Sequence, residues 1–146
     1  MRTLEPKIGR TFIVRLEYES DLLNSLKKIA EDKGIEAGKF FVIGAVKKAA
    51  YSFYDQKEKK YTQVEVKEEM ELLSCLGNIA KMNGKTMVHA HVALSDAEGR
   101  FYGGHLTEGS VVFAGEVVMT ELRGVKLERK YDEITGLNLF DITSGP

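Results

Sequence analysis

The only three histidines of the chain, His89, His91 and His105, lie close together in the sequence. Apolar residues alternate with other residues over positions 86–94, which is typical of a β-strand. His89 and His91 then project from the same face, because side chains two apart on a strand point the same way. Two such imidazoles can converge on one metal ion.

A third imidazole comes from the next predicted strand, residues 101–106. A turn at residues 96–99 precedes this strand, so hairpin pairing brings His105 back towards the first two histidines. Gly103-Gly104 permits a close backbone approach just before it. Three imidazoles leave one tetrahedral position open, as in catalytic zinc sites. The pattern therefore favours a divalent metal, zinc first, although imidazole also suits Cu, Ni and Fe. The alternative is that these are ordinary polar residues on a half-exposed face.

The other reactive groups do not form a recognisable catalytic pattern. Cys75 alternates with apolar residues, so we expect a small buried side chain rather than an activated thiolate. Ser95 and Asp96 are near the histidines only in sequence, and no nucleophile-elbow motif surrounds them. No Gly-rich phosphate loop is present. We therefore assign no catalytic residue and no organic cofactor, and no acid/base partner can be placed among Glu98, Glu108 and Glu116.

The elements that position the histidines are predicted as one helix followed by about seven strands, with one further strand before the helix. The helix begins at Ser20 as N-cap and ends at Gly34, with an apolar stripe at helical spacing between them. Strands are expected at residues 10–18, 39–46, 48–54, 60–66, 70–80, 86–94, 101–106 and 111–122. The fold class is α+β, with a largely antiparallel sheet and the helix after the first strand. One compact domain spans residues 1–146, with a core at about 9–139 and a tail at 140–146.

Composition limits the classes of partner. The 146 residues are 43% apolar and carry a formal charge of −1, so the chain lacks the basic excess that attracts nucleic acid. Basic residues gather at 57–60 and 123–130, where a solvated mixed-charge surface is the simpler interpretation. One cysteine excludes an internal disulfide, and no secretory or membrane-spanning segment is evident, so we expect a cytoplasmic protein.

The segment after Leu122 mixes basic residues with Leu137, Leu139 and Phe140. Such a segment can gain stability by burying its apolar residues. We expect it to pack back on the sheet or on a neighbouring subunit, with a solvated tail as the alternative.

Several short motifs together resemble the PPC domain, named for plants and prokaryotes. They occur from Gly9 to Leu139 and are Gly9-Arg10-Thr11-Phe12, Asp21-Leu22-Leu23, Gly44-Ala45-Val46, Glu71-Leu72-Leu73-Ser74, Gly77-Asn78-Ile79, His89-Ala90-His91-Val92, Gly103-Gly104-His105-Leu106 and Thr135-Gly136-Leu137. The resemblance, to stand-alone prokaryotic members, implies an antiparallel α+β domain, a homotrimer, and a metal on His89, His91 and His105. Plant members bind DNA through AT-hooks, and this chain has no Arg-Gly-Arg core. The sequence also has a weaker likeness to cupins, but it lacks the cupin glutamate and the second cupin motif.

Two functions follow as hypotheses. The first is a trimeric module with a regulatory or DNA-associated role, in which the metal is structural or sensing and DNA binding by the isolated chain is weak. The second is a metal-dependent enzyme that uses a metal-bound water on a small molecule. The sequence identifies neither a substrate nor another small-molecule ligand.

Overall fold

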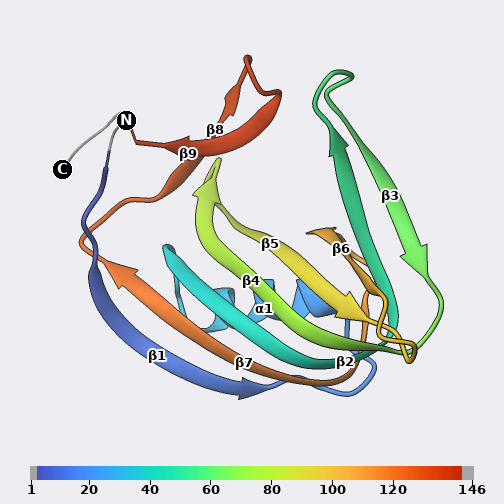
Figure 1. The fold of residues 1–146 in the computed structure, drawn as a ribbon. Coiled ribbons are helices and arrows are strands. Elements are labelled where there is room, and N and C mark those ends of the chain that lie inside the picture. Colours follow the sequence, from blue (N-terminus) through green and yellow to red (C-terminus); the bar gives the residue numbers. More distant parts are fainter. Residues whose placement is uncertain (1–2, 143–146) are drawn as a thin grey trace.

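One long strand, β2 (Gly38–Asp55), organises the sheet in the computed structural model, which describes residues 3–142. Within these residues the chain forms one helix and a nine-stranded sheet (Figure 1). The elements follow in the order β1 (Lys7–Arg15), α1 (Leu22–Asp32), β2, β3 (Lys60–Val66), β4 (Met70–Met82), β5 (Lys85–Ser95), β6 (Phe101–Leu106), β7 (Val111–Arg123), β8 (Glu128–Asp132) and β9 (Leu137–Asp141).

The two halves of β2 have different neighbours. The first half pairs with β7 on one side and β4 on the other, whereas the second half pairs with β3 and, at Tyr51 and Ser52, with β6. Strand β4 also pairs with β5, and β5 pairs with β6. Because β2 pairs with both β4 and β6, the sheet closes on itself through β2. Two separate strands were predicted here. In the structure β2 is instead continuous through Lys47, and its pairing with β7 shifts register between Ala45 and Lys48.

The predicted fold class, α+β with one helix, is correct in outline, whereas the prediction of a largely antiparallel sheet of about seven strands holds only in part. The sheet has nine strands and is mixed, because β8 runs parallel to β4, with Lys81 opposite Glu128. Both additional strands come from the segment after Leu122 and form a short hairpin, β8–β9. Each has five residues, and β8 reads Glu-Arg-Lys-Tyr-Asp, so neither gives a clear apolar alternation.

The helix lies against one face of the curved sheet (Figure 1). It buries Leu22, Leu26 and Ala30 in the common core. Its N-cap is Asp21 rather than the predicted Ser20, since the Asp21 carboxylate accepts a hydrogen bond from the backbone N–H of Asn24 at 2.9 Å. At the other end Gly34, with φ +64°, stops the helix as predicted.

The segment after Leu122 packs back on the sheet through β8, so the solvated-tail alternative is wrong over the described residues. Of the predicted tail at 140–146, residues 143–146 lie outside the described part of the chain. Among residues 3–142 we find no helix with the length and apolar character needed to cross a membrane.

Candidate metal centre

The register of β5 and β6 brings the three histidines together. His91 lies directly opposite His105 in the antiparallel pair, and His89 lies two residues before His91 on β5. The opposite face of β5 is the core face, with Ala90, Val92 and Leu94 buried. Period-2 alternation therefore leaves all three imidazoles on the other side of the sheet, as the sequence predicted.

The ring nitrogens are close enough to share one ion. Each histidine offers a nitrogen within 4.8 Å of those of the other two, and no cysteine, aspartate or glutamate of the described residues joins this cluster. Nε2 of His89 lies 3.3 Å from Nε2 of His91. Two nitrogens bound at about 2.0–2.1 Å to one tetrahedral zinc would lie roughly 3.3–3.4 Å apart. The donor set and this spacing fit a divalent ion, while the identity of that ion stays open.

Two glycines allow β6 to reach this position. A Cβ on Gly103 would lie 2.1 Å from the carbonyl oxygen of Val92, and one on Gly104 would lie 2.6 Å from that of Ser52. Strand β6 is thus squeezed between β5 and β2 directly before His105. Larger residues at these positions would push β6, and His105 with it, away from β5.

The electrostatic environment favours the neutral imidazole at His89 and His105. Burial, followed by the positive charge of Arg129 and the neighbouring histidines, lowers the pKa of His89 to about 4. Burial, the charge on His91 and that on Arg129 also lower the pKa of His105. Neutral imidazole is the form that binds a metal, so the folded chain presents its ligands ready for an ion at neutral pH.

Arg129 on β8 is a residue of the site that the sequence did not reveal. Its side chain is buried, with 8% exposed, and its guanidinium donates to the carbonyl oxygen of Asn138 and to Oδ1 of Asn78, both at 2.7 Å. A third contact, at 3.3 Å, joins Nη2 to Nδ1 of His89. The sequence places Arg129 in a basic segment for which a solvated surface is the simpler interpretation, and the structure instead buries it beside His89.

These contacts assign the protons of the metal-free site. An arginine only donates, so Nδ1 of His89 accepts and its proton lies on Nε2, which donates to Nε2 of His91. A neutral imidazole bound to an ion through Nε2 carries its proton on Nδ1 instead. Metal binding at His89 therefore requires the Arg129 contact to give way, and this contact is the longest of the three.

A pocket of about 230 Å³ adjoins the histidines. Two hairpins enclose it: the hairpin of β2 and β3 supplies Tyr61, and the β8–β9 hairpin supplies Arg129 and Leu137. Both hairpins project from the same end of the sheet (Figure 1). They touch where the Tyr54 hydroxyl donates to the carbonyl oxygen of Thr135 at 2.8 Å and Lys59 donates to that of Glu133 at 2.6 Å.

The remaining reactive side chains take structural roles. Cys75 is fully buried, and burial raises its pKa to about 12, so it is the inert apolar residue that was predicted. The Asp96 carboxylate binds Arg100 at 2.6 Å and Tyr102 at 3.0 Å, while Ser95 donates to a backbone carbonyl. These groups therefore form no triad with the histidines.

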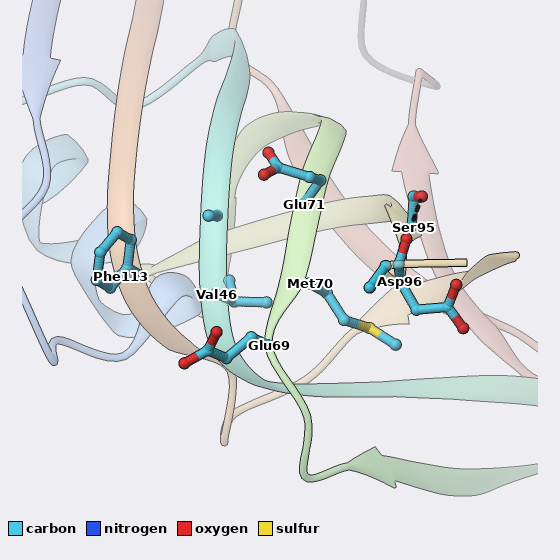
Figure 2. A pocket seen from close by; sticks show the side chains of 9 residues that line it. Val46, Glu69, Met70, Glu71, Ser95, Asp96 and Phe113 are labelled. Atoms are coloured by element: carbon cyan, nitrogen blue, oxygen red, sulfur yellow. Dashed lines mark hydrogen bonds between the residues drawn. The ribbon is translucent and has the colours of Figure 1, made fainter. Parts of the chain in front are cut away.

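A second pocket, of about 280 Å³, lies near Phe113 at the other end of β4. Figure 2 shows that the carboxylates of Glu69 and Glu71 point to one side of the pocket and that of Asp96 points to the opposite side. They do not converge on a common point, so this pocket has no arrangement suited to a cation.

The predicted basic groups are divided among separate partners. Arg123 pairs with Glu121 at 2.9 Å, Lys126 with Glu128 at 3.0 Å, and Lys130 with Asp141. Arg129 is buried at the histidines, and Lys59 is held by the β8–β9 hairpin. Of the four basic residues of 123–130, three thus form surface ion pairs and the fourth, Arg129, is buried.

Solved structures of similar proteins cover nearly the whole chain. The metal-containing protein AF0104 of Archaeoglobus fulgidus is 41% identical, with a TM-score of 0.91 over 96% of this chain and 99% of that one. A plant- and prokaryote-conserved (PPC) protein of Pyrococcus horikoshii is 35% identical, with a TM-score of 0.91 over 97% of each chain. A Bacteroides thetaiotaomicron protein, for which DNA binding has been suggested, is 29% identical, with a TM-score of 0.86 over 94% of this chain and 96% of that one.

Curated relatives are longer proteins. The bifunctional protein GlmU of Synechococcus sp. (strain JA-3-3Ab) is 30% identical over 131 residues, which are 87% of this chain and 20% of that protein. The chain spans about a fifth of the length of the curated relatives it matches. The model of the Plants and Prokaryotes Conserved (PCC) domain matches residues 3–123. The chain therefore belongs to the family of the Plants and Prokaryotes Conserved domain, the PPC family whose motifs its sequence resembles.

Proposed function

We propose that this chain is a homotrimeric metal-binding domain with a regulatory role, in which His89, His91 and His105 hold one divalent ion, with zinc favoured. The observation that carries the proposal is the convergence of three imidazole nitrogens within 4.8 Å. The lowered pKa of both His89 and His105 supports it, since protons then compete less with a metal at neutral pH. A similar protein from Archaeoglobus fulgidus is described as metal-containing.

An exposed apolar row supports the homotrimer. Ile13, Val118, Phe41 and Leu76 are successive register partners across β1, β7, β2 and β4. Ile13 is 85% exposed, Phe41 47% and Leu76 59%. The row continues through Leu76 to its partner His91, so it runs from the edge of the sheet to the histidines. An apolar face of this kind is typical of a protein–protein interface.

A DNA-associated role rests on the suggestion made for the Bacteroides thetaiotaomicron protein. The chain carries a net charge of −1, so we expect the isolated protein to bind duplex DNA weakly at about 150 mM salt, and more weakly as salt rises. Filter binding across a salt series measures this. Sub-micromolar, sequence-selective binding at that salt concentration would establish the DNA-associated role.

Enzymatic activity is the second candidate, and the pocket beside the histidines favours it. A bound zinc supplies a Lewis acid and lowers the pKa of a coordinated water. The chain itself supplies a half-buried site, a cationic Arg129 and the apolar wall of Leu137. None of the residues lining the pocket is a carboxylate, and His89 and His105 would be held by the metal, so Tyr61 is the acid/base group that remains among the lining residues.

Elemental analysis tests the metal centre. Untagged protein prepared without chelators and supplied with zinc should retain one ion per chain at neutral pH. His91→Ala removes one of three ligands and should lose most of the metal, as should His89→Ala and His105→Ala. Circular dichroism should show an unchanged fold, because a domain of this length has a sufficient apolar core without an ion. Wild-type protein that retains no zinc would overturn the proposal.

A further inference from the structure

Arg129 is a buried cation whose charge the described chain does not neutralise. The groups that accept its hydrogen bonds are a carbonyl, an amide and an imidazole, all of them neutral. Its Nε is buried and has no hydrogen-bond partner. A buried charge is retained at little cost only when it is paired with an opposite charge. The guanidinium also lies over the Phe140 ring, with its Cζ 4.6 Å from the ring centroid, but this ring carries no net charge. An anion beside Arg129 would supply the missing opposite charge.

A metal ion would increase this deficit. Nη2 of Arg129 is 3.3 Å from the ring of His89, so a divalent ion on the histidines would add positive charge close to the guanidinium. Binding through Nε2 of His89 also ends the hydrogen bond that Nδ1 accepts, which frees an Nη2 proton of Arg129. An anion near both groups would offset the repulsion and accept that proton.

The pocket between these two charges sets the size and character of the anion. Its volume is about 230 Å³, below the range of about 300–1,000 Å³ that holds drug-sized ligands. Its walls include Met87, Val88, Leu137 and Leu139, and no carboxylate lines it. Such a pocket suits a small ligand with one negative group and a short apolar part.

We propose that the pocket between the histidines and the β8–β9 hairpin binds a small organic carboxylate, whose charged group bridges the bound metal and Arg129. Its hydrocarbon part lies against Leu137 and Met87. This inference rests on the proposed metal centre and gives that centre its ligand class. Arginine is suited to the role, because its planar fork matches the two oxygens of a carboxylate.

Butyrate is a suitable probe, with butyramide as a neutral analogue of the same shape. Isothermal titration calorimetry of zinc-loaded protein, in buffer free of chloride and other carboxylates, measures both affinities. Cobalt-substituted protein reports the same binding through its visible spectrum. We expect butyrate to bind at least about tenfold more tightly than butyramide, and more tightly to loaded than to metal-free protein.

Arg129→Gln removes the charge and keeps hydrogen-bond donors. It should weaken butyrate binding by about tenfold or more while the metal content stays at one ion per chain. Arg123→Gln is the matched control, since Arg123 is exposed and pairs with Glu121, and it should bind butyrate normally. If Arg129→Gln fails to fold, butyrate binding is measured on Arg129→Lys instead. The affinities of wild-type protein for butyrate and butyramide are compared in either case.

Three outcomes would overturn the inference. Loaded wild-type protein that retains zinc but does not distinguish butyrate from butyramide leaves the metal centre standing and removes the anion site. Equal butyrate affinity in Arg129→Gln does the same. Dissociation of an oligomer by Arg129→Gln, without butyrate binding to wild type, assigns the missing carboxylate to a side chain of a second copy. Protein that binds no metal refutes the metal centre, and butyrate binding to metal-free wild type and Arg129→Gln then decides whether Arg129 holds an anion.

Discussion

His89 is the residue at which burial, charge and hydrogen bonding meet. It is half-buried and lies against Arg129, and its ring pKa is lowered to about 4. Its ordinary pKa in an unfolded chain is about 6.5. Between pH 4 and 6.5 this side chain therefore binds a proton in the unfolded chain but not in the folded one. The stability of the fold consequently depends on pH.

We expect the metal-free protein to lose stability as the pH falls from 6.5 towards 4. In that range unfolded His89 binds a proton and folded His89 does not, so the free energy of unfolding decreases as the pH falls, by at most about 1.4 kcal/mol per pH unit for this one proton. Above pH 6.5 both states are neutral and the effect vanishes.

Urea unfolding between pH 7.5 and 5.5, with a chelator present, measures this slope. His89→Gln should reduce it, whereas the slope above pH 7 should be the same in both proteins. His105 contributes in the same direction, so part of the slope should remain in the variant. An identical pH dependence in His89→Gln and wild type would contradict the assignment.

Sequence could predict the convergence of the histidines but not the presence of Arg129. The histidine prediction needed only strand alternation and one hairpin, and the structure confirms that the three side chains meet. Ligation itself stays a prediction. Arg129 lies 40 positions from His89 along the chain, and its burial depends on one parallel contact between β8 and β4. No local pattern encodes such a contact.

At the scale of elements, the spacing of β5 and β6 sets the position of the third imidazole. The carbonyl oxygen of Val92 lies where a side chain on Gly103 would begin. Because His91 and His105 are direct partners, any movement of β6 separates two of the three ring nitrogens.

Gly103→Ala should therefore damage both the sheet and the centre. The Cβ would lie 2.1 Å from Val92 O, so we expect a loss of about 2–4 kcal/mol in the free energy of unfolding and a large loss of bound zinc. Gly84→Ala is the control, because Gly84 also has a positive φ, +75°, but nothing lies within 4 Å of its Cβ position. It should cost about 1 kcal/mol and retain the metal. Full zinc content in Gly103→Ala would show that β6 can shift without affecting the site.

Prediction at this scale succeeded for strands with regular alternation and failed where tertiary contacts decide. Strands β3 and β6 have the predicted bounds, since turn residues flank each of them. The sequence predicts two strands where β2 is continuous, because the charged Lys47 and Lys48 interrupt the apolar residues. Strand β2 changes its pairing partners at this point. The helix N-cap moved by one residue to Asp21, whose carboxylate also accepts from Gly109 at 2.7 Å, a contact over 88 positions.

For the whole molecule, the apolar row on the outer face links assembly to the metal centre. Phe41 lies within the row, and Leu76 joins it to His91. If three copies cover this face, as we propose, then a charge placed within the row should separate them, since a buried unpaired charge is costly.

Phe41→Glu should convert a trimer into monomers. Sedimentation equilibrium at micromolar concentrations measures the mass, which should fall from three times the 16.3 kDa chain to one. Ile134→Glu is the control, because Ile134 is 86% exposed in the turn of the β8–β9 hairpin, away from the row. It should leave the mass unchanged. A wild-type mass of one chain throughout would refute the homotrimer itself.

The sheet closure through β2 has a consequence for the order of folding. All three histidines lie on β5 and β6, which a short turn joins, whereas β1 must pair with β7, bringing Lys7 opposite Arg123. Closing a long loop costs more chain entropy than closing a short one, so distant pairings form slowly. We expect the histidines to meet early in folding, before β8 delivers Arg129. An ion captured at that stage would enter an open hairpin, and the finished molecule would close around it.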